Sequence, residues 1–401
     1  MKMACAQPSE TPIKILAILG SINPRYGGPS MTAPSMWLAA KYAGAELTAG
    51  VCVSNPILAE EMKAIRRLES QGIHIQYFPI SKSFVQIAGR WALSLPLVMW
   101  ILRVAPDYDI IQVHGSWLFS TLAASIVAKV VRRPLLSIPH ESLTEFDMRK
   151  EAGIPKRSVK RMFKSWLLYA ADQIVFSSHL EQNDSVGKTH AGKCAVIYHP
   201  VFEDENFRPR QRQWVESIGV LTVGFLGRFD RKKNLELLLE AVGKIPEVVL
   251  KIAGDGTSVY RKRLDDMVQR LGIASRVEWL GFVLGKDRGK FFESIDVLVM
   301  PSEYECFGRA AAEAMVFGIP TVVAKLTGMA ELVTRHSCGI VIEPDVESIR
   351  KAIVKLRMDG DMLRDFSRRA VAAGKAELSI GSYSRSILKI YGKMKGREMA
   401  G

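Results

Sequence analysis

Short apolar segments rich in β-branched residues alternate with longer helical segments along this chain, and this alternation restricts the possible folds more than any other feature. In the first half the apolar segments are IKILAIL (13–19), LTAGVCV (47–53), IHIQYFPI (73–80), IIQVHG (110–115), LLSIPH (135–140), QIVFSS (173–178) and AVIYHP (195–200). Helix-length segments such as SMWLAAKYAG and STLAASIVAKVV separate several of them. Strands that are apolar on both faces and separated by helices predict a parallel sheet covered on both sides.

The alternation stops at residues 203–217, EDENFRPRQRQWVES, a polar and charged segment typical of a linker. It restarts with VLTVGFLG (220–227), VVLKIAGDG (248–256), VEWLGF (277–282), VLVMPS (297–302), TVVA (321–324) and GIVIEP (339–344). The 401 residues therefore predict an α/β protein of two doubly wound, parallel-sheet, Rossmann-like domains that face each other across a cleft. We place the first domain at 1–205 and the second at 206–382, and expect a helix at about 383–401 to pack back on the first. Ligands of open α/β sheets bind beyond the carboxyl ends of strands, so the cleft is the predicted site.

Charge and cysteine content narrow the class of protein. The net charge of +14 favours anionic partners, namely a phosphate-bearing substrate, nucleic acid or an acidic membrane surface. The five cysteines are scattered without a CxxC spacing, which indicates a reducing compartment and neither a disulfide framework nor a zinc site. The N-terminus lacks the apolar stretch of a signal peptide, and WALSLPLVMWIL (91–102) is too short to span a membrane. We therefore expect a cytoplasmic protein.

The most informative motif is PSEYECFGRAAAEAM (301–315), which predicts a strand end, a loop with Glu305 and a helix that begins at Gly308. The backbone N–H groups of Phe307, Gly308 and Arg309 would be unpaired donors at the positive end of that helix, where they suit a phosphate. Glu313 leans back toward the same end, so two carboxylates converge on one pocket, where each can accept hydrogen bonds from sugar hydroxyls. The alternative is a solvated loop glutamate and a helix glutamate that stabilises the dipole.

A second motif, GRFDRKKN (227–234), lies where a predicted strand passes into a helix. Taken alone it is a charged, solvated turn. If the neighbouring loop presents a helix N-terminus to a phosphate, Arg228 and Lys233 supply countercharges, Arg228 as a planar fork and Lys233 as a point charge. Such a set stabilises a nucleotide diphosphate leaving group while the bond to it breaks.

These motifs together resemble those of the retaining glycosyltransferases of the two-domain GT-B fold, in particular glycosyltransferase family 4. GRFDRKKN is similar to the GR-x-x-x-x-K motif of that family, AGDGT (253–257) and LGFV (280–283) to its next two strand ends, and PSEYECFGRAAAEAMVFGIP (301–320) to its P-S-x-x-E-x-F-G block. The match runs in order from about 220 to 333. Two departures are LTGMAELV, which has Thr327–Gly328 where the family has a Gly-Gly pair, and HPVFED, which stands in place of Asn-Gly-Val-Asp.

The resemblance implies a role for each matching residue. Arg228 and Lys233 would bind the donor diphosphate, Glu313 the ribose hydroxyls and Glu305 the donor sugar near the reacting carbon. The remaining donor-site residues would be the backbone at Phe282 and Val283 beside the base, the helix end at Phe307, Gly308 and Arg309, and the glycine-rich loop RYGGPS with Gly27 and Gly28 near the phosphate. His140, in PHESL, would face the donor sugar, its alternative being an ordinary loop histidine. The implied catalytic set is Glu305, His140, Arg228 and Lys233.

The resemblance also implies the reaction, which is transfer of a hexose from a GDP- or UDP-sugar to a glycan or lipid-linked glycan, with retention of configuration and without cofactor or metal. Bacterial surface polysaccharide synthesis is the expected setting. DYD (107–109) is superficially similar to a metal-binding Asp-x-Asp, but it precedes a strand instead of following one, and we interpret it as a solvated strand start.

An acceptor surface is suggested by residues 148–168, which combine seven cations with interleaved Met, Val, Phe, Trp and Leu. Together with 91–102, this segment suits peripheral docking on an anionic membrane face. The alternative is a solvated helix whose apolar face packs inside. Nucleic acid is disfavoured because the chain has no aromatic-studded basic sheet and no helix-turn-helix pattern.

Three other functions deserve comparison. A Rossmann dehydrogenase is disfavoured because GDGTSV has Val259 where the third glycine belongs. A nucleotide-sugar epimerase of related fold is an enzyme alternative, and it would release isomerised sugar without an acceptor. A non-catalytic sugar-nucleotide-binding subunit is the third, and the intact set of Arg228, Lys233, Glu305 and Glu313 speaks against it.

Overall fold

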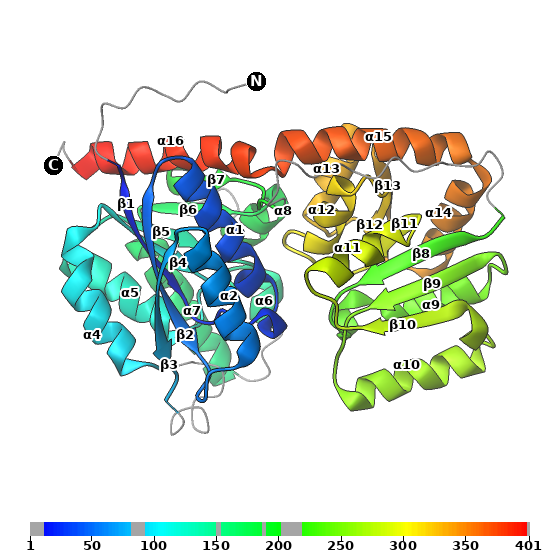
Figure 1. The fold of residues 1–401 in the computed structure, drawn as a ribbon, viewed down its shortest axis with the longest axis horizontal. Coiled ribbons are helices and arrows are strands. Elements are labelled where there is room, and N and C mark those ends of the chain that lie inside the picture. The colour runs from blue at the N-terminus through cyan, green and yellow to red at the C-terminus, as the bar shows by residue number, and fades with distance from the viewer. Residues whose placement is uncertain (1–11, 82–92, 150–153, 187–189, 202–218, 399–401) are drawn as a thin grey trace.

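Two parallel sheets, each covered by helices on both faces, form two domains that lie side by side (Figure 1). The computed structural model describes residues 12–81, 93–149, 154–186, 190–201 and 219–398. The predicted linker 203–217, and with it the predicted boundary between the domains, lies outside the described residues. The predicted fold class is confirmed.

The first sheet has seven strands in the order β3-β2-β1-β4-β5-β6-β7, all parallel. Its strands are β1 (Lys14–Leu19), β2 (Glu46–Val53), β3 (His74–Pro79), β4 (Ile110–His114), β5 (Leu135–Ile138), β6 (Gln173–Phe176) and β7 (Cys194–Val196). Each coincides with a predicted apolar segment to within a few residues. The prediction succeeded because both faces of the central strands are buried, so their apolar runs are continuous: in β1, Ile15 and Ala17 belong to one core and Leu16 and Ile18 to the other.

The second sheet has six parallel strands in the order β10-β9-β8-β11-β12-β13. They are β8 (Leu221–Leu226), β9 (Val248–Ala253), β10 (Val277–Gly281), β11 (Val297–Met300), β12 (Thr321–Ala324) and β13 (Gly339–Ile342). Both sheets reverse their strand order beside the first strand, between β1 and β4 and between β8 and β11. A ligand crevice is expected at such reversal points.

Helices cover both faces of each sheet. The first domain contains α1 (Gly28–Tyr42), α2 (Ala59–Ser70), α4 (Leu95–Val104), α5 (Phe119–Val130), α6 (Glu145–Arg149), α7 (Ile154–Ala170) and α8 (His179–Val186). The second contains α9 (Leu235–Gly243), α10 (Ser258–Arg270), α11 (Lys286–Glu293), α12 (Arg309–Val316), α13 (Met329–His336), α14 (Val346–Met358) and α15 (Gly360–Glu377). Short 3-10 turns occupy Pro24–Tyr26, Ala105–Asp107, Ala191–Lys193, Arg231–Lys233 and Ala274–Arg276.

The last helix, α16 (Ile380–Glu398), leaves the second domain after α15 and lies along the first (Figure 1). It packs against α1, and its buried residues Tyr383, Ile387 and Tyr391 join the core formed by α1, α2 and β1. Val201 and Leu378, which flank the two crossings between domains, share a backbone hydrogen bond of 3.1 Å. The described chain therefore leaves the first domain at Val201 close to the point, after Leu378, where it returns to that domain.

Candidate active site

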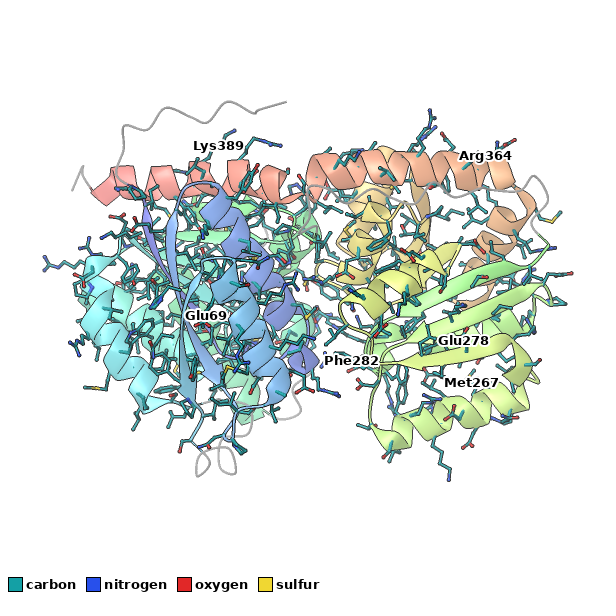
Figure 2. All side chains as sticks on the ribbon, in the orientation of Figure 1. Glu69, Met267, Glu278, Phe282, Arg364 and Lys389 are labelled. Carbon is teal, nitrogen blue, oxygen red and sulfur yellow. The ribbon has the colours of Figure 1, made fainter. Side chains whose placement is uncertain are left out.

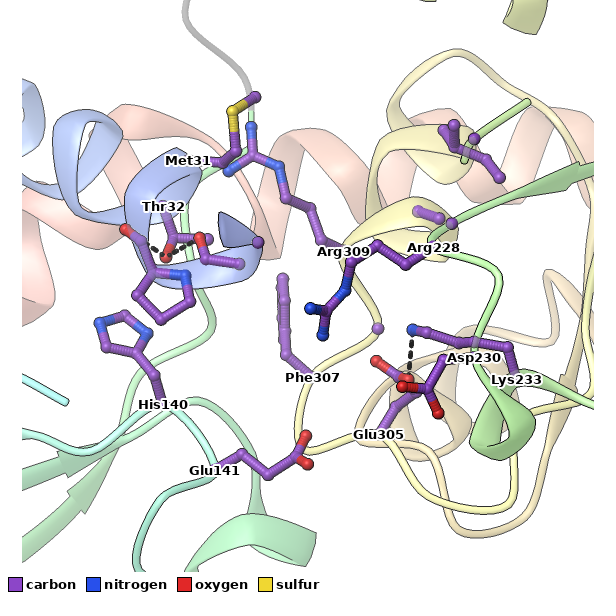
Figure 3. Close-up of a pocket in the computed structure, with 18 of the residues that line it drawn as sticks. Met31, Thr32, His140, Glu141, Arg228, Asp230, Lys233, Glu305, Phe307 and Arg309 are labelled. Atoms are coloured by element: carbon purple, nitrogen blue, oxygen red, sulfur yellow. Dashed lines mark hydrogen bonds and ion pairs between the residues drawn. The ribbon is translucent and has the colours of Figure 1, made fainter. Parts of the chain in front are cut away.

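A cavity of about 570 Å³ lies between the two domains, at the carboxyl ends of their central strands. The first domain contributes the loop after β1 and the loop after β5, and the second contributes the loops after β8, β10 and β11. All the predicted site residues except Glu313 line this cavity. Figure 3 shows His140 and Glu141 on one side and Arg228, Lys233 and Glu305 on the other.

The GRFDRKKN turn owes its shape to backbone pairing with the next strand end. Gly227 and Phe229 donate backbone hydrogen bonds to the carbonyls of Ala253 (3.0 Å) and Asp255 (2.7 Å). Asn234 adopts a left-handed conformation (φ 51°), which asparagine tolerates well, and its side-chain amide donates to the Pro301 carbonyl at 3.0 Å. The turn is thus tied to both neighbouring loops, and Arg228 is exposed in the cleft.

Two lysines of this turn contact carboxylates in the cleft. Lys233 forms an ion pair with Glu305, so two predicted residues neutralise each other in this structure. Lys232 was not among the predicted site residues. It reaches across to the first domain, where it forms an ion pair with Glu141 at 2.9 Å, and it also lies 3.7 Å from the Glu305 carboxylate. Burial acts to lower the pKa of Lys232, but the charges of Glu305 and Glu141 hold that pKa above its ordinary value. Lys232 is therefore a charged link between the domains.

The loop that carries Glu305 is held by the loop after β12. Glu305 donates its backbone N–H to Leu326 (3.0 Å), and Gly328 donates to the Glu305 carbonyl (2.8 Å). Gly328 needs its small size, because a Cβ there would lie 2.2 Å from the Cys306 carbonyl oxygen and 2.8 Å from Ser178 of the first domain. The single glycine of the Thr327–Gly328 departure thus lies at a close contact between the two domains.

Gly308 immediately precedes α12, and its positive φ of 94° turns the chain into that helix. A Cβ at Gly308 would lie 2.7 Å from Met300 and 2.9 Å from Thr327, so a larger residue would push the helix start out of place. The start of α12 faces the cavity through Phe307, Gly308 and Arg309, where a helix N-terminus can bind an anion.

Glu313 lies behind the cavity wall and is held by two arginines. Its carboxylate accepts from Arg309 Nε at 2.6 Å and from Arg288 Nε at 2.5 Å. Burial acts to raise the pKa of Glu313, but the charges of Arg288 and Arg309 lower it below the usual range. Arg288, in the first turn of α11, lines the cavity and was not predicted, because its position in GKDRGKFF is that of an ordinary exposed helix residue.

Gly27 and Gly28 lie where the loop after β1 meets α1, which begins at Gly28. Gly27 has φ 106°, and a Cβ built there would lie 3.8 Å from Arg228 Cζ across the cleft. Arg25 of the same loop pairs with Asp255 at 3.5 Å and stacks over the Phe282 ring at 5.1 Å. Phe282, labelled in Figure 2, lies at the face of the second domain nearest the first, and Val283 follows it along the cavity wall.

His140 and Glu141 form a strained turn after β5, since both have positive φ (51° and 76°). Buried Glu181 at the start of α8 stabilises this turn by accepting the Glu141 backbone N–H at 2.6 Å. Burial raises the pKa of Glu181 despite its hydrogen bonds. Burial also lowers the pKa of His140 to about 3, so the ring is neutral.

His199, in the second departing motif, was missed by the sequence analysis. Its ring lies 5.1 Å from the His140 ring and 4.8 Å from the Phe307 ring, as centroid distances, and it lines the cavity. Burial, together with His140, lowers its pKa well below 6.5. Its Nε2 atom is buried without a hydrogen-bond partner among the described residues. The one sequence signal that could have indicated His199 as a site residue is its position after β7, the last strand of the first sheet.

Two further findings concern metals and membranes. Within the described ranges no group of three or more His, Cys, Asp or Glu side chains is arranged to hold a metal ion. Asp109 of the DYD segment instead precedes β4 and accepts the Lys14 backbone N–H at 2.9 Å. Among the helices that the structure describes, none has the length and apolarity to cross a membrane.

Comparison with known proteins agrees with the arrangement of the second domain. Residues 210–372 match the family Glycosyl transferases group 1. The matched residues lie in the second half of the chain. An uncharacterized glycosyltransferase of Methanocaldococcus jannaschii is 32% identical over 252 residues, which are 59% of this chain and 63% of that protein. A sulfoquinovosyl transferase of Arabidopsis thaliana is 28% identical over 308 residues, 71% of this chain and 55% of that protein. This chain thus spans between 55% and 63% of these two relatives.

The structural similarity extends over nearly the whole chain. The crystal structure of Anabaena HepE in complex with UDP and glucose matches with a TM-score of 0.73 and 23% identity, covering 95% of this chain and 100% of that one. A sucrose-phosphate synthase from Thermosynechococcus elongatus matches with a TM-score of 0.71, 18% identity and coverage of 96% and 100%. With the two parallel sheets, these matches establish the GT-B fold.

Proposed function

We propose that this protein is a retaining glycosyltransferase that moves a hexose from a nucleotide diphosphate sugar to a glycan or lipid-linked glycan. The observation that carries the proposal is the cavity between the domains, where Arg228, Lys233 and the start of α12 surround one space with Glu305 at its edge. The match of residues 210–372 to the family Glycosyl transferases group 1 supports glycosyl transfer as the reaction class. The structural neighbour that was crystallised with UDP and glucose supports a nucleotide-sugar donor.

The ion pair between Lys233 and Glu305 suggests how the donor is received. A diphosphate entering the cavity competes with Glu305 for Lys233, because a phosphate offers more negative charge and several acceptor oxygens. Once released, the Glu305 carboxylate accepts hydrogen bonds from sugar hydroxyls. Arg228, Lys233 and the α12 end then stabilise the leaving diphosphate electrostatically, so we expect the reaction to proceed without a metal. Activity that persists in EDTA would support this expectation.

The chemical step that we propose keeps the configuration of the sugar. The bond between the anomeric carbon and the diphosphate oxygen breaks, and its electron pair stays with the phosphate. The acceptor hydroxyl oxygen bonds to the same face of the oxocarbenium-like carbon, and its proton passes to the departing phosphate oxygen. NMR of the product, which reports the anomeric configuration, tests this outcome directly.

Donor binding is the first experiment. Saturation-transfer NMR of the full chain against UDP-, GDP- and ADP-sugars would be repeated with Arg228→Ala and with Arg231→Ala. Arg231 is the matched control, because it belongs to the same turn and is exposed but does not line the cavity. Binding of one donor by wild type and Arg231→Ala, lost in Arg228→Ala, is the expected result. Binding of no sugar nucleotide contradicts the proposal, and isomerised sugar released without an acceptor identifies an epimerase.

We further propose peripheral attachment to an anionic membrane through the layer formed by α4, α5 and α7, where α5 contacts both neighbours. Exposed large apolar side chains gather on these helices: Leu95, Met99, Leu102, Ile126, Val130, Val159, Met162 and Tyr169. Exposed Arg157 and Arg161 on α7 add positive charge to this layer. Part of the predicted segment packs inside instead, since Phe163 and Leu167 are buried, and residues 150–153 lie outside the described residues. Attachment here would place the enzyme at the membrane surface, where it could meet a lipid-linked acceptor. Such an acceptor would fit a role in surface polysaccharide synthesis.

A further inference from the structure

A continuous row of buried polar groups runs from the last helix through the core of the first domain to His140. Tyr391 of α16 donates from its hydroxyl to Gln112 Oε1 at 2.7 Å. Gln112 Nε2 lies 2.8 Å from His114 Nε2, and His114 Nδ1 lies 3.0 Å from His140 Nε2. Tyr391, Gln112 and His114 are each 1% exposed. Placing polar groups in a core is costly unless each finds a partner, and here each has one.

The hydrogen-bond pattern determines where the proton of each histidine lies. The indole N–H of Trp37 approaches His114 Nε2 at 3.1 Å, and an indole nitrogen can only donate. His114 Nε2 therefore accepts. Burial, together with His140, lowers the pKa of His114 well below 6.5, so its ring is neutral and carries its single proton on Nδ1. That proton is donated to His140 Nε2, which leaves the proton of His140 on its own Nδ1.

The orientation of Gln112 agrees with this assignment. The lone pair of His114 Nε2 must face the amide NH₂ group, since the amide oxygen would repel it. The Gln112 oxygen is then left to accept from Tyr391, as the 2.7 Å contact shows. Tyr391 and Gln112 are 279 residues apart, and their contact is formed only because α16 returns to the first domain. The last helix thus takes part in setting the proton position at His140.

We propose that Trp37, Gln112 and Tyr391 are positioning residues that, through His114, hold His140 in the Nδ1–H tautomer, so that it offers a hydrogen-bond donor to an oxygen acceptor in the cavity. His140 lines the cavity, and no described residue accepts a hydrogen bond from its Nδ1. The oxygen that it would meet is a sugar hydroxyl or a phosphate oxygen, an assignment that rests on the proposed function. The opposite tautomer would direct a lone pair at that oxygen. A hydroxyl could rotate to compensate, whereas a phosphate oxygen could not.

The test begins with a measurement that needs no substrate. In the full chain labelled with ¹⁵N-histidine, long-range ¹H–¹⁵N spectra distinguish the two neutral tautomers. Signals are assigned by their loss in His114→Gln and His140→Gln. We expect both rings in the Nδ1–H form in the wild type and a mixture of tautomers in Trp37→Phe/Tyr391→Phe. An Nε2–H tautomer at His140 in the wild type overturns the proposal, whether or not the protein transfers a sugar.

Kinetics then separate positioning from packing. Tyr391→Phe is compared with Tyr383→Phe, because Tyr383 is buried on the same helix in the same core, but its hydroxyl has no partner among the described residues. Loss of a hydrogen bond that orients His140 is expected to lower kcat about two- to tenfold in Tyr391→Phe and more in the double variant, with little change in Tyr383→Phe. Equal losses in the two single variants would show that packing alone is affected and would overturn the proposal. Absence of nucleotide-sugar turnover in the wild type would instead count against the proposed function.

Discussion

At the scale of single residues, Glu313 is held by Arg288 and Arg309, and it is open to test whether its carboxylate also binds a ligand or only anchors these two arginines. If it binds ribose, the wild type should prefer a ribonucleoside diphosphate over the 2′-deoxy form, and Glu313→Gln should remove that preference. Removing the charge also leaves Arg288 and Arg309 without their partner, which should cost roughly 3–5 kcal/mol of unfolding free energy. Calorimetric titration with both nucleotides measures the preference. A preference that survives in the variant would assign Glu313 a structural role alone.

Three histidines of the first domain give the protein a specific sensitivity to acid. The pKa values of His114, His140 and His199 are all lowered by burial, that of His140 to about 3. Below pH 6.5 these histidines bind protons in the unfolded chain but stay neutral in the native protein. The free energy of unfolding therefore has its full value above pH 6.5 and decreases as the pH falls. Each ring should contribute up to about 1.4 kcal/mol of lost unfolding free energy per pH unit.

Urea unfolding between pH 7.5 and 5 measures this loss, with His199→Asn as the comparison. The unfolding free energy of the variant should fall less steeply with decreasing pH than that of the wild type. The difference in slope should equal the contribution of one histidine ring. Burial raises the pKa of Glu181, so this residue changes the free energy of unfolding with pH in the direction opposite to the histidines. The effect is the same in the wild type and the variant, and it cancels when the two are compared. Identical slopes would mean that His199 is protonated in the native protein.

At the scale of elements, the turn at His140 and Glu141 depends on contacts from outside its own strand. Glu181 holds its backbone, and Lys232 of the second domain holds its side chain. In Lys232→Met the amide exchange of residues 139–146 should accelerate about tenfold or more, because a largely buried, charge-assisted hydrogen bond is lost. Lys325→Met, which breaks an exposed pair with Glu343, is the control and should leave this segment unchanged. Unchanged exchange in Lys232→Met would show that the turn is stable without the second domain.

The elements themselves were predictable, and the contacts between them were not. Strands such as β1 and β8 could be located because burial on both faces gives a continuous apolar run, which a single sequence displays. The loops at Arg228 and Gly308 could be singled out because their residue types suit a phosphate, and the loop at Glu305 because a carboxylate accepts hydrogen bonds from sugar hydroxyls. All three residues line the cavity. By contrast, Arg288 and His199 reach the cavity only through the packing of separate elements, so no local pattern marks them. Lys232 lies inside the GRFDRKKN motif, but its contact with Glu141 depends on how the two domains pack. The same holds for Tyr391, whose partner lies on a distant strand.

At the scale of the whole molecule, the excess of positive charge and the exposed apolar side chains on α4, α5 and α7 predict binding to anionic bilayers. The full chain should sediment with vesicles that contain phosphatidylglycerol and much less with phosphatidylcholine alone, and salt should weaken the binding. Met99→Ser/Met162→Ser/Tyr169→Ser should reduce the affinity at least about tenfold, because each buried apolar side chain contributes on the order of 1 kcal/mol or more.

The matched control for this triple variant is Val259→Ser/Met358→Ser, which alters exposed apolar side chains on α10 and α14 of the second domain. It should bind vesicles as the wild type does, because those helices lie on the domain away from α4, α5 and α7 (Figure 1). Equal affinity of the triple variant and the wild type would assign any binding to charge alone, since the cations are untouched in both. Equal losses in the two variants would point to a general effect of surface hydrophobicity. Only a selective loss in the triple variant places the bilayer against the first domain, where His140 and the returning helix α16 also lie.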